Sequence, residues 1–110
     1  MNRHRETKEQ LLPKGWFVSD AEKAIQFYNE LQRELPKGHI LYRKEVCVIA
    51  HRGATDDILC QHKDDKTHFT VIHLTWSGKE EKGTDYPYVE CDGNFNDFLE
   101  YENRFLGNET

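Results

Sequence analysis

The run Thr67–Trp76 constrains the fold of this chain more than any other segment. It is rich in β-branched and aromatic residues, and it therefore predicts a β-strand. Side chains alternate along a strand, so one face carries Phe69, Val71 and His73, and the other carries Ile72, Leu74 and Trp76. Because both faces hold apolar residues, we expect both to be covered, either by helices that straddle the sheet or by a helix and a partner.

Three further segments are expected to extend this strand into a sheet. Glu45–Arg52 and Ile58–His62 are strand-like, and short polar turns join them to Thr67–Trp76, so that consecutive strands pair as antiparallel hairpins. Tyr86–Cys91 adds an edge strand or an extended segment, because Pro87 cannot donate to a central ladder. The sequence thus predicts an antiparallel meander of three to four strands.

A helix is predicted on each side of this meander in the sequence. Ser19 and Glu22 match the S-x-x-E capping box, and Pro36 ends the helix that follows. One face of this helix carries an apolar stripe, and the opposite face, which includes Glu30, is expected in solvent. The stripe consists of Ala21, Ala24, Ile25, Tyr28, Leu31 and Leu35.

Asn94 is expected to cap the second helix, and Gly107 to end it. One side of that helix carries Phe95, Phe98, Leu99, Glu102, Phe105 and Leu106. The fold class is therefore α+β, with an N-terminal helix, the meander and a C-terminal helix.

The length of 110 residues corresponds to one domain. Residues 1–10 are polar without a periodic apolar face and are expected to form a flexible N-terminal arm, whereas residues 11–110 form a single α+β domain. Trp16 follows a Pro and a Gly, so we expect a turn that places it against the core. Thirteen aromatic residues argue against disorder.

The charge of −5 disfavours nucleic acid as a partner, because phosphate binding needs clustered Lys and Arg. No apolar stretch is long enough to span a membrane and no signal-type segment is present, so we expect a cytoplasmic protein. Between Asp85 and Thr110 seven acidic residues accompany one base, Arg104. That composition predicts an acidic surface, which either docks a basic partner or is simply a solvated helix face.

Several of the six histidines fall on or beside predicted strands. His68 and His73 are five residues apart and point to opposite sides of the sheet, so at most one of them joins any one cluster. The strongest metal candidates are Cys60, His62 and His73. They lack diagnostic spacing, and hydrogen-bonded sheet histidines are the more ordinary interpretation. The sequence predicts neither a metal nor another cofactor.

An enzyme is not the leading expectation. The three cysteines are far apart and odd in number, which predicts reduced and mostly buried thiols, and no familiar catalytic motif is present. Trp76 leads directly into the charged segment 77–82, which is either a recognition loop with an aromatic anchor or a soluble turn behind a Trp that plugs the sheet. The residues expected to bind a partner are Trp76, Lys79, Glu80, Glu100 and Glu102.

The segments Leu12–Trp16 (LPKGW) and Leu35–His39, then His73–Glu80 (HLTWSGKE) followed by Pro87, resemble the signature of a family of small, largely uncharacterised bacterial proteins. The resemblance spans most of 11–105. This family is similar to the small acidic immunity proteins that accompany bacterial toxins. The resemblance implies a non-enzymatic protein that neutralises a basic toxin, and it transfers no catalytic residue.

Two other functions stay open. One is a small hydrolase or nuclease-like enzyme that uses sheet histidines and Cys60. The other is a structural or adaptor domain that self-associates through an edge strand, as a homodimer.

Overall fold

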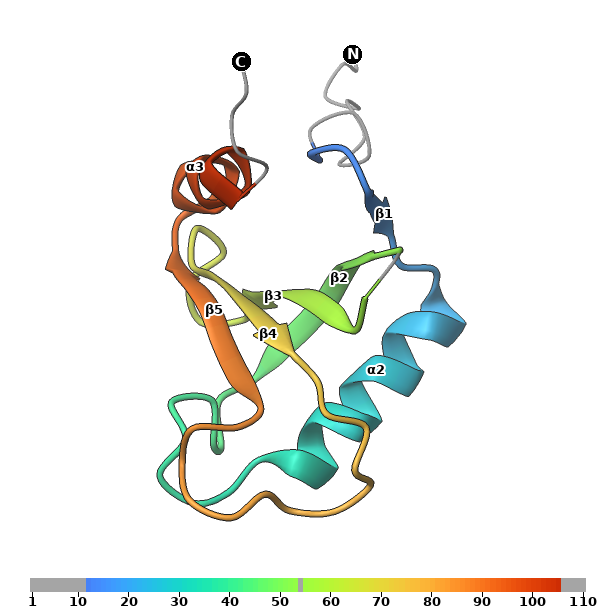
Figure 1. Cartoon of the computed structure of the whole chain (residues 1–110), viewed down its shortest axis with the longest axis vertical. Coiled ribbons are helices and arrows are strands. Elements are labelled where there is room, and N and C mark those ends of the chain that lie inside the picture. The colour runs from blue at the N-terminus through green and yellow to red at the C-terminus, as the bar shows by residue number, and fades with distance from the viewer. Residues whose placement is uncertain (1–11, 54, 106–110) are drawn as a thin grey trace.

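The computed structural model describes residues 12–53 and 55–105, so the expected arm at residues 1–10 lies outside it. Five antiparallel strands form one sheet in the order β1-β2-β3-β4-β5, which is also their order along the chain (Figure 1). The elements are β1 (Trp16–Val18), α2 (Ala21–Glu34), β2 (Val46–Arg52), β3 (Asp57–His62), β4 (Phe69–His73), β5 (Tyr88–Gly93) and α3 (Phe95–Phe105). The α+β class and the antiparallel meander are confirmed.

The strand β1 is the main difference from the expected fold, because it makes five strands and precedes the first helix. Its three residues pair with Ala50–Arg52 of β2. A strand this short has no periodicity of its own, and its pairing depends on a partner more than thirty residues away. Trp16 is buried, as expected.

The helix α2 begins one residue later than the predicted capping box requires. Its N-cap is Asp20, whose side chain accepts a hydrogen bond from the Lys23 N–H at 2.8 Å. The predicted box of Ser19 and Glu22 is therefore wrong, and the Ser19 hydroxyl instead lies 2.7 Å from Nδ1 of His51. Asp and Ser cap helices about equally well, so the choice between two adjacent residues depends on this tertiary contact.

The buried face of α2 is rotated from the predicted stripe. Leu31 and Leu35 are buried as expected, but Ile25 and Tyr28 are exposed. Glu30 was expected in solvent, and it is instead buried, as is Glu34. The reason is the backbone of the segment after β4, which supplies N–H donors to these carboxylates.

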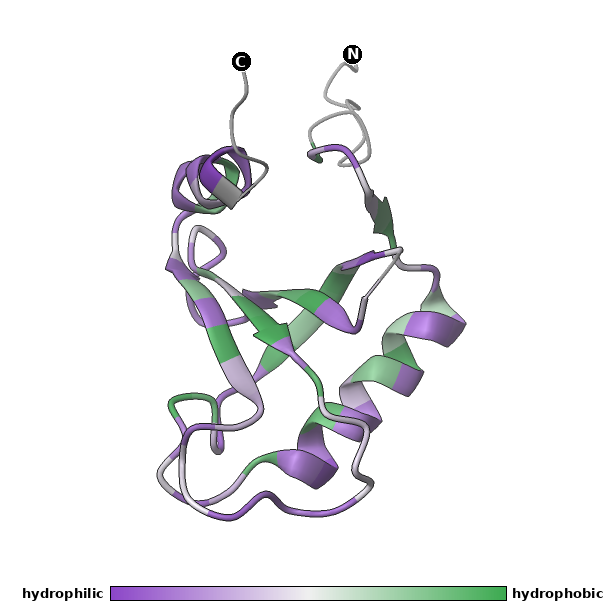
Figure 2. Ribbon diagram, in the orientation of Figure 1, coloured by the Kyte–Doolittle hydropathy of each residue, from purple (hydrophilic) through white to green (hydrophobic). Residues whose placement is uncertain are grey.

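Two cores lie on opposite faces of the sheet, which confirms the predicted alternation of β4. Ile72 and Leu74 join the core beneath α2, whereas Phe69 and Val71 join the core that contains Phe98 of α3. The ribbon places α2 beside β2 and α3 beside β5, and the hydropathy colouring shows the central strands as predominantly apolar (Figures 1 and 2). The two helices thus straddle the sheet.

The edge strand after Pro87 and the cap of the last helix agree with the sequence-based predictions. The segment around Pro87 leads into β5, which is an edge strand. Asn94 caps α3, since its Oδ1 accepts from the Asp97 N–H while Asp97 accepts from the Asn94 N–H. The side chain of Phe105, and residues Leu106 and Gly107, lie outside the described part of the chain.

Candidate functional site

The segment that follows β4 presents Trp76 to solvent. The ladder of β4 ends at His73, and Leu74 is still buried. Trp76 then adopts a φ of 57°, in the left-handed region that a bulky residue rarely occupies. Its side chain is 43% exposed. A strained conformation of this kind persists only where its surroundings hold it in place, and such positions occur often in binding sites.

Two buried carboxylates of α2, Glu30 and Glu34, hold this segment, and we refer to them as the carboxylate pair. Glu34 accepts hydrogen bonds from the backbone N–H of Thr75 at 3.0 Å and of Trp76 at 2.7 Å. Glu30 accepts from the N–H of Gly78 at 3.0 Å, and its other oxygen binds Arg33. The conformation of Trp76 is therefore fixed by side chains one layer below the surface.

The two members of the carboxylate pair shift each other's pKa. Burial, and then a hydrogen bond with Glu30, raise the pKa of Glu34 from 4.5 to about 7. The hydrogen bond with Glu34 lowers the pKa of Glu30 despite burial. Near neutral pH the pair thus tends to share one proton.

Aromatic rings from three elements form a row with the ring of Trp76 in this segment. Phe17 of β1 lies 6.1 Å from His51 of β2, between ring centroids, and Phe27 of α2 lies 5.2 Å from His51 and 6.1 Å from Trp76. We call these four residues the aromatic row. Both of its ends are exposed, Phe17 at 51% and Trp76 at 43%. Such a surface suits protein contacts, in which aromatic side chains are enriched.

The other residues expected to bind a partner do not form one surface. Lys79 and Glu80 are exposed beyond Trp76, and Glu100 is exposed on α3. Glu102 is fully buried and forms a bidentate ion pair with Arg52 at 2.8 and 3.0 Å. The structure therefore places Glu102 inside the molecule, where it cannot contact a partner.

Two of the residues expected to form an acidic surface, Glu90 and Glu102, are likewise largely withdrawn from solvent. Of the seven acidic residues after position 84, Glu90 and Glu102 surround Arg52, and Asp92 binds His68. Asp97 completes the capping of α3. Much of the negative charge in this region thus serves contacts within the chain. Asp85, Asp92, Asp97 and Glu100 are still exposed, and Glu109 lies outside the described residues.

A cluster of charged side chains surrounds Arg52 on the α3 side of the sheet. Nε of Arg52 binds Asp57 at 2.8 Å, and its guanidinium lies 4.9 Å from the Trp16 ring. The other oxygen of Asp57 accepts from Nδ1 of His73 at 2.7 Å. Glu90 lies 3.9 Å from both the guanidinium and this imidazole nitrogen.

The two carboxyl groups nearest His73 differ in their acidity. Burial favours the neutral form of Asp57, but hydrogen bonds with Glu90, Thr55 and His73 outweigh it and lower its pKa to about 2. Burial, and then the neighbouring Asp57, raise the pKa of Glu90 to about 7. Asp57 is therefore an anion at neutral pH, and it orients the ring of a half-exposed histidine.

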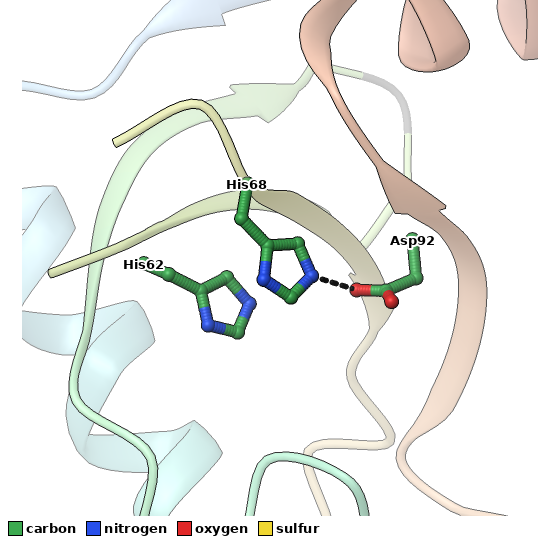
Figure 3. Close-up of side chains that lie close together, drawn as sticks. All are labelled: His62, His68 and Asp92. Atoms are coloured by element: carbon green, nitrogen blue, oxygen red, sulfur yellow. Dashed lines mark hydrogen bonds and ion pairs between the residues drawn. The ribbon is translucent and has the colours of Figure 1, made fainter. Parts of the chain in front are cut away.

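A second cluster contains His62 and His68, whose rings stack with centroids 3.7 Å apart and planes inclined by 3° (Figure 3). His68 donates to Asp92 at 2.8 Å. Thr70 donates to the same carboxylate at 2.5 Å and so accepts from Nε2 of His62, 2.8 Å away. Burial, and then His68, lower the pKa of His62. The cluster is a chain of hydrogen bonds that runs from His62 through Thr70 and Asp92 to His68.

The metal candidates Cys60, His62 and His73 are not brought together. Cys60 and His62 lie on the α2 side of the sheet, while His73 lies on the opposite side, with Asp57. The expectation that His68 and His73 belong to different clusters is confirmed. Cys60 is fully buried, and burial raises the pKa of its thiol to about 12, which is unsuited to a nucleophile.

Comparison with known proteins adds no family to this description. No protein-family model, no curated protein and no solved structure matches the chain. Within residues 12–53 and 55–105, no helix is long and apolar enough to cross a membrane.

Proposed function

We propose that this protein is a non-enzymatic protein-binding domain whose contact surface is the aromatic row. One observation carries the proposal. A half-exposed tryptophan, Trp76, is held in the left-handed region by two buried carboxylates. A solvent-exposed turn without a binding role has no evident need for such support from the core.

The support under Trp76 reduces the cost of binding. A loop that must be ordered on association loses backbone conformational entropy, roughly 1–2 kcal/mol for each residue that is fixed. Hydrogen bonds to Glu34 already fix the backbone of Thr75 and Trp76 in the free protein. Tryptophan is also one of the residue types in which interface hot spots are enriched.

The partner that this proposal favours is a basic protein. The net charge of −5 steers basic surfaces toward the chain. An immunity-type protein that neutralises a basic bacterial toxin is the specific form of the proposal, and it agrees with the sequence resemblance. The aromatic row would then supply affinity, and the charge would supply a fast association rate.

The two other functions have less support. A hydrolase that uses Cys60 needs a thiolate, which the buried thiol disfavours. Self-association through a sheet edge is opposed by both edges, because β1 has three residues and β5 carries a bulge. Short and bulged edge strands are common devices against edge-to-edge pairing.

Affinity capture from the native host tests the proposal. The full chain, its Trp76→Ala variant and a matched Ile40→Ala variant would be used, since Ile40 is an exposed apolar residue outside the aromatic row. We expect one stoichiometric partner with the wild type and with Ile40→Ala, and its loss with Trp76→Ala. The proposal fails if no stoichiometric partner appears, or if Trp76→Ala retains it fully.

A further inference from the structure

Three neighbouring strands bring a carboxylate, an imidazole and a second carboxylate to one place. Asp57 on β3 and His73 on β4 are register partners. On β5 the register skips a residue, since Val71 pairs with Cys91 while Ile72 pairs with Val89. The extra residue is Glu90. A bulge redirects the side chain of its extra residue, and this one directs Glu90 toward the other two.

Each carboxylate is held by one oxygen and presents the other. Oδ2 of Asp57 accepts from Arg52 at 2.8 Å and from the Thr55 hydroxyl at 2.6 Å. Oε1 of Glu90 accepts from the Tyr101 hydroxyl at 3.0 Å. The remaining oxygens, Oδ1 and Oε2, face Nδ1 of His73. Outer partners that orient ligand atoms in this way are a regular feature of metal sites.

The spacing of these atoms is close to that of a coordination sphere. Metal–ligand bonds of about 2.1 Å place neighbouring ligand atoms of a tetrahedral site roughly 3.4 Å apart. The distances from Nδ1 of His73 are 2.7 Å to Asp57 and 3.9 Å to Glu90, on either side of that value. All three ligand atoms lie within 4.8 Å of one another. Small side-chain movements would complete the geometry.

Charge balance favours a doubly charged cation at this place. Among the described residues, the carboxylates of Asp57, Glu90 and Glu102 contact a single guanidinium, that of Arg52. When all three carboxylates are ionised, their negative charge exceeds the positive charge of Arg52 by two, and these side chains are about nine-tenths buried or more. Uncompensated buried charge is costly, and a divalent cation would neutralise it.

We propose that Asp57, His73 and Glu90 bind a divalent transition-metal cation of the Zn²⁺ or Mn²⁺ class. One imidazole and two carboxylates suit these ions, and the half-exposed His73 provides the route for entry. Such an ion would tie together three strands and, through the Tyr101 hydroxyl, the helix α3.

The stacked histidines make a poorer site for the same ion. The lone pair of an imidazole nitrogen lies in the plane of its ring. Because the rings of His62 and His68 are parallel and stacked, their lone pairs cannot converge on one ion without rearrangement. Their hydrogen bonds to Thr70 and Asp92 are moreover complete without a metal. This second cluster therefore serves as an internal control.

Calorimetric titration of the chelator-treated full chain with Zn²⁺ tests the proposal. We expect one ion per chain with a micromolar or tighter Kd, and an affinity at least about tenfold weaker for Glu90→Gln. Gln at this position keeps an oxygen that can accept from the Tyr101 hydroxyl. The matched variant His68→Ala is expected to bind Zn²⁺ as the wild type does.

Nuclear magnetic resonance of the wild type decides the case without relying on any variant. On addition of Zn²⁺ the ring signals of His73 are expected to shift stoichiometrically, while those of His62 and His68 stay in place. Absence of stoichiometric binding overturns the proposal. So does an unchanged affinity in folded Glu90→Gln, or a zinc response confined to His62 and His68.

Discussion

Replacement of Glu34 by Gln is the most informative change to the segment that holds Trp76. Glu34 is fully buried, and its pKa is raised from 4.5 to about 7, chiefly by burial. The folded chain therefore binds the proton more tightly than the unfolded chain does. This contribution to stability is fully present below about pH 4.5, and it is lost as the pH rises through about 7.

The magnitude follows from linkage. One pKa unit corresponds to about 1.4 kcal/mol, so the full shift corresponds to roughly 3 kcal/mol. Between about pH 5.5 and about pH 8.5 the wild type should lose about 2 kcal/mol of unfolding free energy through this group. Gln cannot titrate and resembles the protonated carboxyl group in shape. The loss that Glu34 causes should therefore be absent from Glu34→Gln.

Urea unfolding of both proteins across this pH range measures the effect. The difference between them reports on Glu34, because every other ionisable group is present in both proteins and the lowered pKa of Glu30 lies below this pH range. The exposed Glu80→Gln serves as a control and should follow the wild type. If the wild type and Glu34→Gln lose stability in parallel from about pH 5.5 to about pH 8.5, the burial argument for Glu34 is wrong.

Two further predictions concern the core. Arg52→Met should lower the unfolding free energy by about 3–5 kcal/mol, because it leaves the buried carboxylate of Glu102 unpaired. Urea titrations measure this change, and a loss below about 1 kcal/mol would contradict the ion-pair account. In the folded protein the exposed Cys47 should react first with a thiol reagent, and the buried Cys60 should stay unlabelled until the protein unfolds. Mass spectrometry measures the labelling of each cysteine. Equal labelling rates for Cys47 and Cys60 would show that Cys60 is accessible.

The parts of the fold that were predictable are those with strong local periodicity. The alternation in Phe69–His73 placed each side chain on the correct face, and the Asn94 cap of α3 was visible from the residue type. The orientation of α2 was not predictable in this way. Glu30 and Glu34 look like solvent-facing residues, and only the N–H groups of a distant segment explain why they are buried.

The same limit applied to the clusters of side chains. The opposite orientation of His68 and His73 followed from the period of a strand. The period of a strand could not predict the partners of His73. These partners depend on the register between β3 and β4 and on the bulge at Glu90. The acidic composition after position 84 likewise suggested a surface, whereas Glu90 and Glu102 surround a buried arginine. Charge counts alone cannot distinguish these arrangements.

Site-specific photo-crosslinking in the native host tests the binding surface most directly. A photoreactive phenylalanine analogue would replace Phe17 in the aromatic row or, as the control, Ile40, and both positions are 51% exposed. We predict a discrete adduct with one protein from position 17 and none from position 40. Equal adducts from both positions, or none from position 17, would contradict the assignment of the aromatic row as the contact surface.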